Sequence, residues 1–253
     1  MDLFYPQVAV QLGGYTFKKG VAVTVCSDAA SDSDWATVRF TSPLGDAMTL
    51  KKLDAARVYL GYSGSFTKVF DGLLTTDFSA ATGSIKELRL RDAAIRLAGT
   101  PVNHAFVNAT PQEVVRTCCR MAGITEVVTA DTVYPAKTYP VVGIKALQAI
   151  KDINHHWGIA ATGYMQDGAY RWNSPPEQSE MMLFEYGKNI VSLTKEGGLW
   201  VLTTVSVPQI KHSIKFALSH PQLSGTFTVQ KVIFSSIDRG FIRTKIYFKG
   251  AST

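Results

Sequence analysis

Two adjacent histidines, His155 and His156, precede Trp157 and Gly158 and are the first residues of this chain whose types suggest chemistry. Imidazole binds metals and transfers protons near neutral pH. A chelating pair on a helix needs a spacing of four residues, however, because neighbouring side chains diverge by about 100°. At a helix carboxyl end, an imidazole instead favours the dipole and donates to the last carbonyls. The spacing therefore predicts a helix end and no metal site.

The three cysteines are the next candidates for reactive groups. They are Cys26, Cys118 and Cys119, an odd number with two neighbours in a helical pattern. That arrangement does not make a disulfide framework and is typical of a reducing compartment. No other cysteine or histidine has ligand spacing to the pair, so we expect small buried hydrophobes, with Cys118 in the core and Cys119 nearer its edge.

Carboxylates that are distant in the sequence can still meet in space as the acid and base of a glycan-cleaving enzyme. Asp71, Asp92 and Glu185 are candidates, and the sequence does not choose among them. Motifs for serine hydrolases, zinc proteases, dinucleotide sites and thiol redox sites do not occur. Gly61–Lys68 lacks the G-K-[ST] ending of a phosphate loop. We therefore expect no enzyme, and no catalytic, cofactor-binding or metal-ligating residue.

The charge of the chain is basic but dispersed. The sequence has 26 Lys and Arg against 20 Asp and Glu, a net charge of +6. These cations occur in ones and twos, without the long run that marks a nucleic-acid tail. We predict no sequence-specific binding of nucleic acid. The dispersed pairs include Lys18–Lys19, Lys51–Lys52, Arg89 with Arg91, and Arg243 with Lys245.

The composition favours a β protein with a large core. Of 253 residues, 46% are hydrophobic and only 18% charged, with Val, Ile, Thr, Phe and Tyr throughout. Ala36, Val38 and Phe40 alternate with polar residues, as in a strand with one buried face. Leu88 and Leu90 alternate with arginines in the same way. No signal peptide and no apolar run of about 18 residues is present, so we expect neither secretion nor membrane insertion.

Between residues 100 and 160 the apolar period becomes helical. Thr110 is predicted as the N-cap of a helix near 111–122, with Pro111 at its first position, Glu113 closing a capping box and Gly123 beyond its end. The apolar positions of its buried face are predicted as Val114, Val115, Cys118 and Met121.

A second helix is predicted near 144–157 and ends at Gly158 as a C-terminal cap. Its predicted stripe is Ile144, Leu147, Ile150, Asn154 and Trp157. Strands resume afterwards, beginning with a hairpin around residues 166–168. The sequence thus predicts a first β region at 1–98, with enough strands to close a small barrel or sandwich, a helix-containing insert at 99–165 and a second β region at 166–253.

This order of elements resembles the baseplate hub proteins of phage tails and contractile particles. That family includes the late-control D-like proteins and the N-terminal part of type VI secretion spike proteins. A strand, turn and strand with Gly61, Tyr62, Phe70 and Gly72 is similar to one of its features. The resemblance also covers the first helix, the second helix with its hairpin, and the closing strands. These segments are 56–76, 110–124, 146–172 and 218–248.

The resemblance implies a mainly β fold with a small α-containing insert and two tube-like barrels. It also implies a homotrimer whose six barrels form a pseudo-sixfold ring that joins a tail tube to a central spike. The implied partners are tail tube, spike, tape-measure and other baseplate proteins. The implied location is the baseplate of a virion or tail-like particle, assembled in the bacterial cytoplasm.

Other functions remain open beside the hub. A tail tube or distal tail protein is the alternative within the structural class. A nucleic-acid-binding β-barrel would gather cations and exposed aromatics on one face and bind less tightly in salt. A glycan-active enzyme would have a cleft with two carboxylates.

Overall fold

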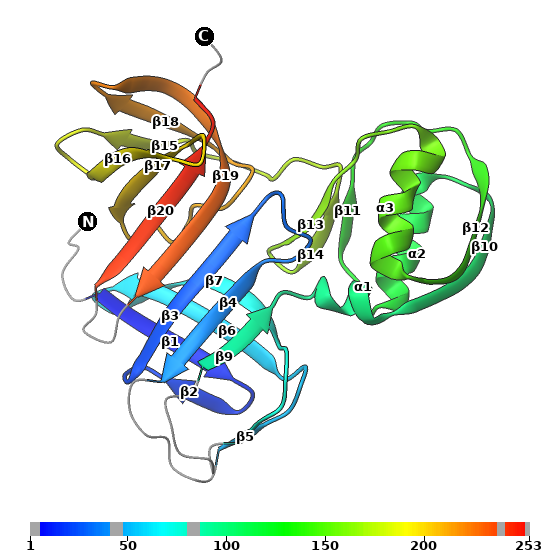
Figure 1. Ribbon diagram of the computed structural model, residues 1–253, viewed down its shortest axis with the longest axis horizontal. Coiled ribbons are helices and arrows are strands. Elements are labelled where there is room, and N and C mark those ends of the chain that lie inside the picture. Colours follow the sequence, from blue (N-terminus) through cyan, green and yellow to red (C-terminus); the bar gives the residue numbers. More distant parts are fainter. Residues whose placement is uncertain (1–5, 41–47, 80–86, 237–240, 251–253) are drawn as a thin grey trace. The chain divides into compact units, whose positions relative to one another are not determined.

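The computed structural model describes residues 6–40, 48–79, 87–236 and 241–250 (Figure 1). The chain divides into two compact units, which we call unit 1 (1–92 with 177–253) and unit 2 (93–176). Strands dominate, and the described part contains three helices, all in unit 2. The expected mainly β fold with a small α-containing insert is confirmed.

Unit 1 is built on one 13-stranded sheet. Its main path is β16-β17-β20-β19-β3-β4-β9-β7-β6-β1-β2, and β18, with β15 beside it, branches from β19. The first-half strands are β1 (Pro6–Leu12), β2 (Tyr15–Phe17), β3 (Val21–Asp28), β4 (Trp35–Phe40), β6 (Ala55–Tyr62), β7 (Ser65–Leu74) and β9 (Glu87–Arg91). The second-half strands are β15 (Met182–Glu185), β16 (Ile190–Glu196), β17 (Leu199–Val205), β18 (Lys215–His220), β19 (Leu223–Ser236) and β20 (Ile242–Phe248). A separate pair comprises β5 (Thr49–Leu50) and β8 (Phe78–Ser79).

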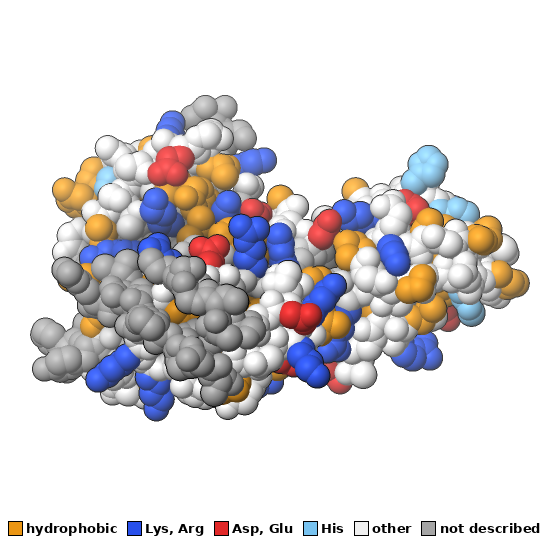
Figure 2. Space-filling view, turned by 60° about the horizontal axis from the view of Figure 1, so that its bottom comes forward, with side chains coloured by type: hydrophobic (Ala, Val, Ile, Leu, Met, Phe, Trp, Pro, Cys, Tyr) orange, Lys and Arg blue, Asp and Glu red, His pale blue; other side chains and the backbone are white. Residues whose placement is uncertain are grey.

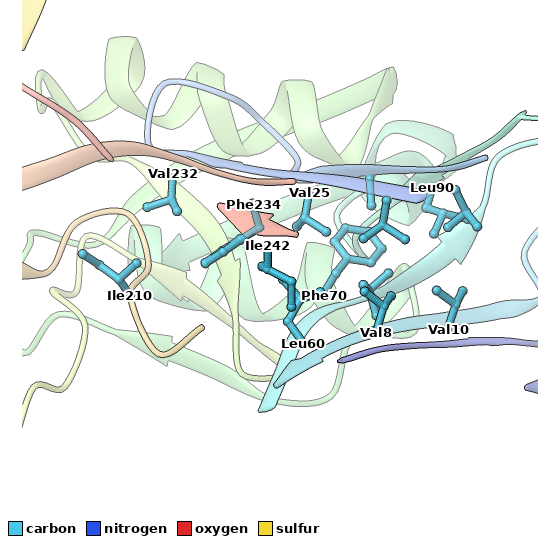
Figure 3. Packing of buried hydrophobic residues seen from close by; sticks show 14 of the residues in the cluster. Val8, Val10, Val25, Leu60, Phe70, Leu90, Ile210, Val232, Phe234 and Ile242 are labelled. Carbon is cyan, nitrogen blue, oxygen red and sulfur yellow. The ribbon is translucent and has the colours of Figure 1, made fainter. Parts of the chain in front are cut away.

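The two halves of unit 1 are joined by the antiparallel pairing of β3 with β19. Phe234 lies opposite Val25 in this register, and both side chains are buried. Figure 3 shows β1 and β6 residues facing those of β3, β19 and β20 across a common core. The two β regions that the sequence separates therefore share one sheet and one hydrophobic cluster, and their closure into two tube-like barrels stays a prediction.

The expected alternation is confirmed in β4 and β9. Ala36, Val38 and Phe40 are buried, and so are Leu88 and Leu90, which face the core beside them. The alternation arises because successive strand residues point to opposite faces of the sheet. The opposite face of this part of the sheet consequently carries the polar partners.

Unit 2 has its own core around two helices. Its helices are α1 (Ile95–Gly99), α2 (Pro111–Met121) and α3 (Ala146–Trp157). The strands β10 (Pro101–Ala109) and β12 (Lys137–Lys145) pair with each other. A second small sheet has the order β11-β14-β13, formed by β11 (Val127–Thr129), β13 (Gly163–Gln166) and β14 (Ala169–Trp172).

Both predicted helix boundaries of α2 are confirmed. Thr110 accepts from the Glu113 backbone N–H, and the Glu113 carboxylate accepts from the Thr110 N–H at 2.7 Å. The predicted buried face is partly wrong, since Met121 is 44% exposed and Cys119 is fully buried. The helix contacts α3 as well as β11 and β14, so its buried arc is wider than one stripe.

The stripe predicted for α3 is also partly wrong. Ile150 and Trp157 are buried as expected, but Ile144 belongs to β12. The other buried positions are Ala146, Ala149 and Ile153. Alanine contributes little to an apolar pattern, yet its small side chain lets a helix approach its neighbours closely.

The limits of unit 2 differ from the predicted insert of 99–165. At one end α1 precedes the predicted start. At the other, β14 pairs with β11 in parallel, and Tyr170 and Trp172 are buried in the core of unit 2. Those two aromatic residues place the predicted hairpin in unit 2 and not in the following β region.

Candidate functional site

His155 and His156 lie in the last turn of α3, as predicted, and Gly158 caps it in the left-handed conformation (φ 68°). His155 is exposed, whereas the ring of His156 packs on those of Tyr139 and Trp157 at 4.9 and 4.7 Å. The cation that reaches the helix end is Lys137, whose Nζ donates to the His156 carbonyl at 2.9 Å. The two histidines therefore lie in different environments, one exposed and one packed on aromatic rings. Their described contacts are those of a packed helix end.

The paired cysteines are both inside unit 2. Burial raises the pKa of Cys118 to about 11 and that of Cys119 to about 12. A thiol with such a pKa is protonated at neutral pH and is a poor nucleophile or ligand. Among the described residues, no group of three His, Cys, Asp or Glu side chains has a geometry that holds a metal ion.

The candidate carboxylates lie on different elements and have different partners. Asp71 bonds Lys68 Nζ at 2.6 Å and lies 3.4 Å from Arg57 Nε. Glu185 forms an ion pair with Lys188 at 2.9 Å. Each of these acids is compensated by a basic neighbour on the surface.

Asp92 is buried and belongs to a carboxylate cluster that sequence pattern alone did not single out. It accepts from the Asp34 backbone N–H at 2.7 Å and from Ser33 Oγ at 2.9 Å. Asp34 in turn accepts from the Asp28 N–H at 3.0 Å. The S-D-S-D sequence at 31–34 was the only local signal, and the cluster ties the β3–β4 turn to the end of β9.

The ionisation of Asp34 is strongly altered by this environment. Burial, reinforced by the nearby charges of Asp92 and Asp28, raises its pKa to about 7. Hydrogen bonds from Ser27 and Asp28 oppose that rise. The donors are backbone N–H groups and serine hydroxyls of the same chain segment, so the cluster is arranged to hold the chain together rather than to face a substrate.

The remaining histidines are packed in different places. His212 is only 2% exposed, and its Nδ1 lies 2.8 Å from Ser213 Oγ. Burial lowers its pKa to about 4. The ring of His104 contacts that of Phe106 edge to face, and the ring of His220 contacts that of Tyr186 in the same way.

Gly61–Lys68 is the hairpin between β6 and β7 and not a phosphate loop. Ser63 and Gly64 both have positive φ, which a tight two-residue hairpin requires. A Cβ on Gly61 would overlap the Ser65 carbonyl, so glycine is needed for the strands to approach. The peptide N–H of Gly64 donates to Gln7 on β1.

The edges of the unit 1 sheet present strands that, within the described ranges, pair with a neighbour on one side only. Among the described strands, β16 pairs only with β17, β15 only with β18, and β2 only with β1. Exposed apolar side chains lie on β15 and β16 and at the two residues that flank β15, and we call them the edge patch. Its residues and exposed fractions are Met181 (52%), Leu183 (51%), Tyr186 (64%) and Val191 (54%). Free edges with apolar side chains are suited to assembly with another chain.

Comparison with solved structures relates this whole architecture to phage tail components. The 43 kDa tail protein of prophage MuSo2 from Shewanella oneidensis matches with a TM-score of 0.73 and 12% identity, over 96% of this chain and 97% of that one. A tail protein from Neisseria meningitidis MC58 matches with a TM-score of 0.71 and 13% identity, over 98% and 97%. The chain has the fold of phage tail proteins.

A third match extends the likeness to a secretion system. The Escherichia coli c3393 protein, described as a type VI secretion component structurally similar to T4 tail proteins gp27 and gp5, matches with a TM-score of 0.71 and 11% identity. The match covers 96% of this chain and 77% of that one. The resemblance predicted from the order of elements is therefore confirmed at the level of the fold.

Comparison by sequence gives no match, in contrast to comparison by structure. No protein-family model and no curated protein matches the sequence. Within the ranges that the structure describes, no helix is both long and apolar enough to cross a membrane.

Proposed function

We propose that this chain is a structural subunit of a phage tail or a phage-tail-like particle. The observation that carries this proposal is the match of nearly the full chain to nearly the full length of two phage tail proteins. Both units take part in those matches, so the likeness concerns the complete architecture and not one common barrel. The buried cysteines and locally compensated carboxylates support a non-enzymatic role.

Within the tail, we assign the chain to the baseplate hub, as a homotrimeric ring between tube and spike. The secretion component that shares the fold supports this position, because its description names similarity to gp27 and gp5 together. The proposed partners are tail tube, spike, tape-measure and other baseplate proteins. The proposed location is the tail of the particle, after assembly in the bacterial cytoplasm.

The sheet of unit 1 has the features that such a ring needs. Its main path ends at β16 on one side and at β2 on the other, and neither edge is paired beyond its neighbour among the described strands. Edges of this kind are stable when another chain covers them. We propose that β16 and the edge patch form part of the contact between copies. In such a head-to-tail contact, one edge of a copy meets a different edge of the next copy, and repetition of the contact closes a ring.

A matched pair of variants tests this contact. Leu183→Asp with Val191→Asp places two charges in the edge patch, and Val133→Asp with Val142→Asp places two at exposed valines of unit 2. We expect sedimentation to show loss of the trimer for the first variant and retention for the second. Equal behaviour of the two variants would contradict the assigned contact.

The tail-tube alternative gives a different result in the same experiment. A tube subunit would form hexameric rings or stacked tubes rather than trimers. Sedimentation of the unaltered chain as a hexamer would therefore replace the hub assignment, while the broader structural role in a tail would stand.

A further inference from the structure

One face of the unit 1 sheet concentrates cations that are dispersed in the sequence. On β17-β20-β19-β3-β4-β9, the side chains opposite the core form rows of directly paired residues. The first row is Arg89, Thr37, Thr24, Ser235, Arg243 and Val205. The second row is Arg91, Trp35, Cys26, Ile233, Lys245 and Thr203, of which Cys26 is buried. We call these two rows the basic face.

Neither row contains a carboxylate, although each spans six strands. Arg89 and Lys245 are exposed, with 79% of the Arg89 side chain open to solvent, and Arg91 and Arg243 are partly buried. The acids beside the two rows lie on flanking positions, where Glu87 approaches Arg89 at 3.9 Å and Asp28 approaches Lys231 at 3.8 Å. Figure 2 shows Lys and Arg side chains over one face of unit 1, with Asp and Glu side chains among them.

The spacing of the cations selects an elongated ligand. Arg89 and Arg91 lie two residues apart on β9, and Arg243 and Lys245 have the same spacing on β20. Four strand spacings separate the two pairs, a distance of about 19 Å at about 4.8 Å per strand. A small anion does not bridge that distance, whereas an extended polyanion reaches both pairs.

The groups between the two cation pairs favour a nucleic acid strand over an acidic peptide. Thr37, Thr24 and Ser235 offer hydroxyl donors for phosphate oxygens along the first row. Trp35, which is partly buried, provides an aromatic surface in the second row, where an unpaired base can stack. We propose that the basic face binds a single nucleic acid strand through its phosphates, without sequence preference. This goes beyond the proposed structural role and does not depend on it.

Charge reversal with a matched control tests the inference on the full chain. Arg89→Glu with Lys245→Glu removes one cation at each end of the basic face. Lys51→Glu with Lys215→Glu makes the same change in net charge at exposed positions outside it. The probe is a fluorescein-labelled oligothymidylate of about 20 nucleotides, titrated at several salt concentrations.

We expect the basic-face variant to bind about tenfold more weakly at low salt, and the salt slope of log K to fall by about 1.4 for two lost phosphate contacts. The control variant should keep most of the affinity. Equal weakening of both variants would show attraction by net charge only. A polyglutamate peptide that binds as tightly, with the same loss in the variant, would replace the nucleic acid by an acidic protein segment. Either result, or no measurable binding by the unaltered chain, overturns the proposal.

Discussion

At the scale of single residues, the cluster of Asp34 and Asp92 makes stability depend on pH. Asp34 has a pKa of about 7 when folded, against an ordinary value of 3.8. Between these values the folded chain holds a proton that the unfolded chain releases. The contribution of Asp34 to stability is therefore complete below about pH 4 and is lost as the pH rises to about 7.

Asp34→Asn should remove this dependence. In urea denaturation at pH values from 4 to 7, we expect the free energy of unfolding of the variant to decline less with rising pH than that of the unaltered chain. Glu180→Gln, an exposed acid of the same unit, is the control and should leave the profile unchanged. An equal decline in the free energy of unfolding for Asp34→Asn and the unaltered chain would contradict the raised pKa of Asp34.

His212 acts in the opposite direction over nearly the same range. Its pKa is about 4 when folded, against 6.5 ordinarily, so the unfolded chain binds the extra proton as the pH falls. The stabilising contribution is present above about pH 6.5 and is lost toward pH 4. In the same denaturation series, His212→Asn should lose less of its free energy of unfolding between pH 6.5 and pH 4 than the unaltered chain. His155→Asn, at an exposed position of α3, is the control and should leave this loss unchanged. Retention of the full acid-side loss by His212→Asn would be inconsistent with this assignment.

At the scale of elements, the capping box of α2 is both predictable and testable. Thr110→Ala removes the oxygen that accepts from the Glu113 N–H, and we expect a loss of about 1 kcal/mol in stability. Thr138→Ala, at an exposed position of β12, is a control with the same chemical change. Thermal unfolding monitored by circular dichroism measures both, and an unchanged midpoint for Thr110→Ala would argue against the cap.

The features predicted correctly from the sequence are mostly local. Thr110 and Gly158 mark helix boundaries because caps depend on residues within a few positions. The buried arc of α2 was less predictable, since this helix packs against α3 and β14, which are distant in the chain. The contact of Asp34 with Asp92 joins positions 58 residues apart, which no local pattern encodes.

The basic face illustrates the same limit for a candidate site. Arg89 and Arg91 look like the outward residues of one strand, and Arg243 and Lys245 like those of another. These two pairs of cations lie on one sheet only because β3, from the first β region, pairs with β19, from the second. Charges that are dispersed in the sequence thus become one surface only through sheet topology.

At the scale of the whole molecule, the chain interrupts one sheet with a second compact unit. Residues 93–176 leave and return between two halves that share a core. A change that weakens the β3–β19 pairing should therefore affect both halves together. Val25→Ala and Phe234→Ala should each reduce the stability of all of unit 1, by about 1–2 and 3–5 kcal/mol respectively, in hydrogen-exchange or denaturation experiments. Loss confined to one half would contradict a common core.

We propose that copies of this chain assemble into a tail ring. Native mass spectrometry of the purified full chain, supported by electron microscopy, tests it most directly. We expect a species of three times the 27.6 kDa chain mass, seen as a ring with a central opening and pseudo-sixfold outline. A chain that stays monomeric at high concentration and never enters a tail particle would contradict the claim.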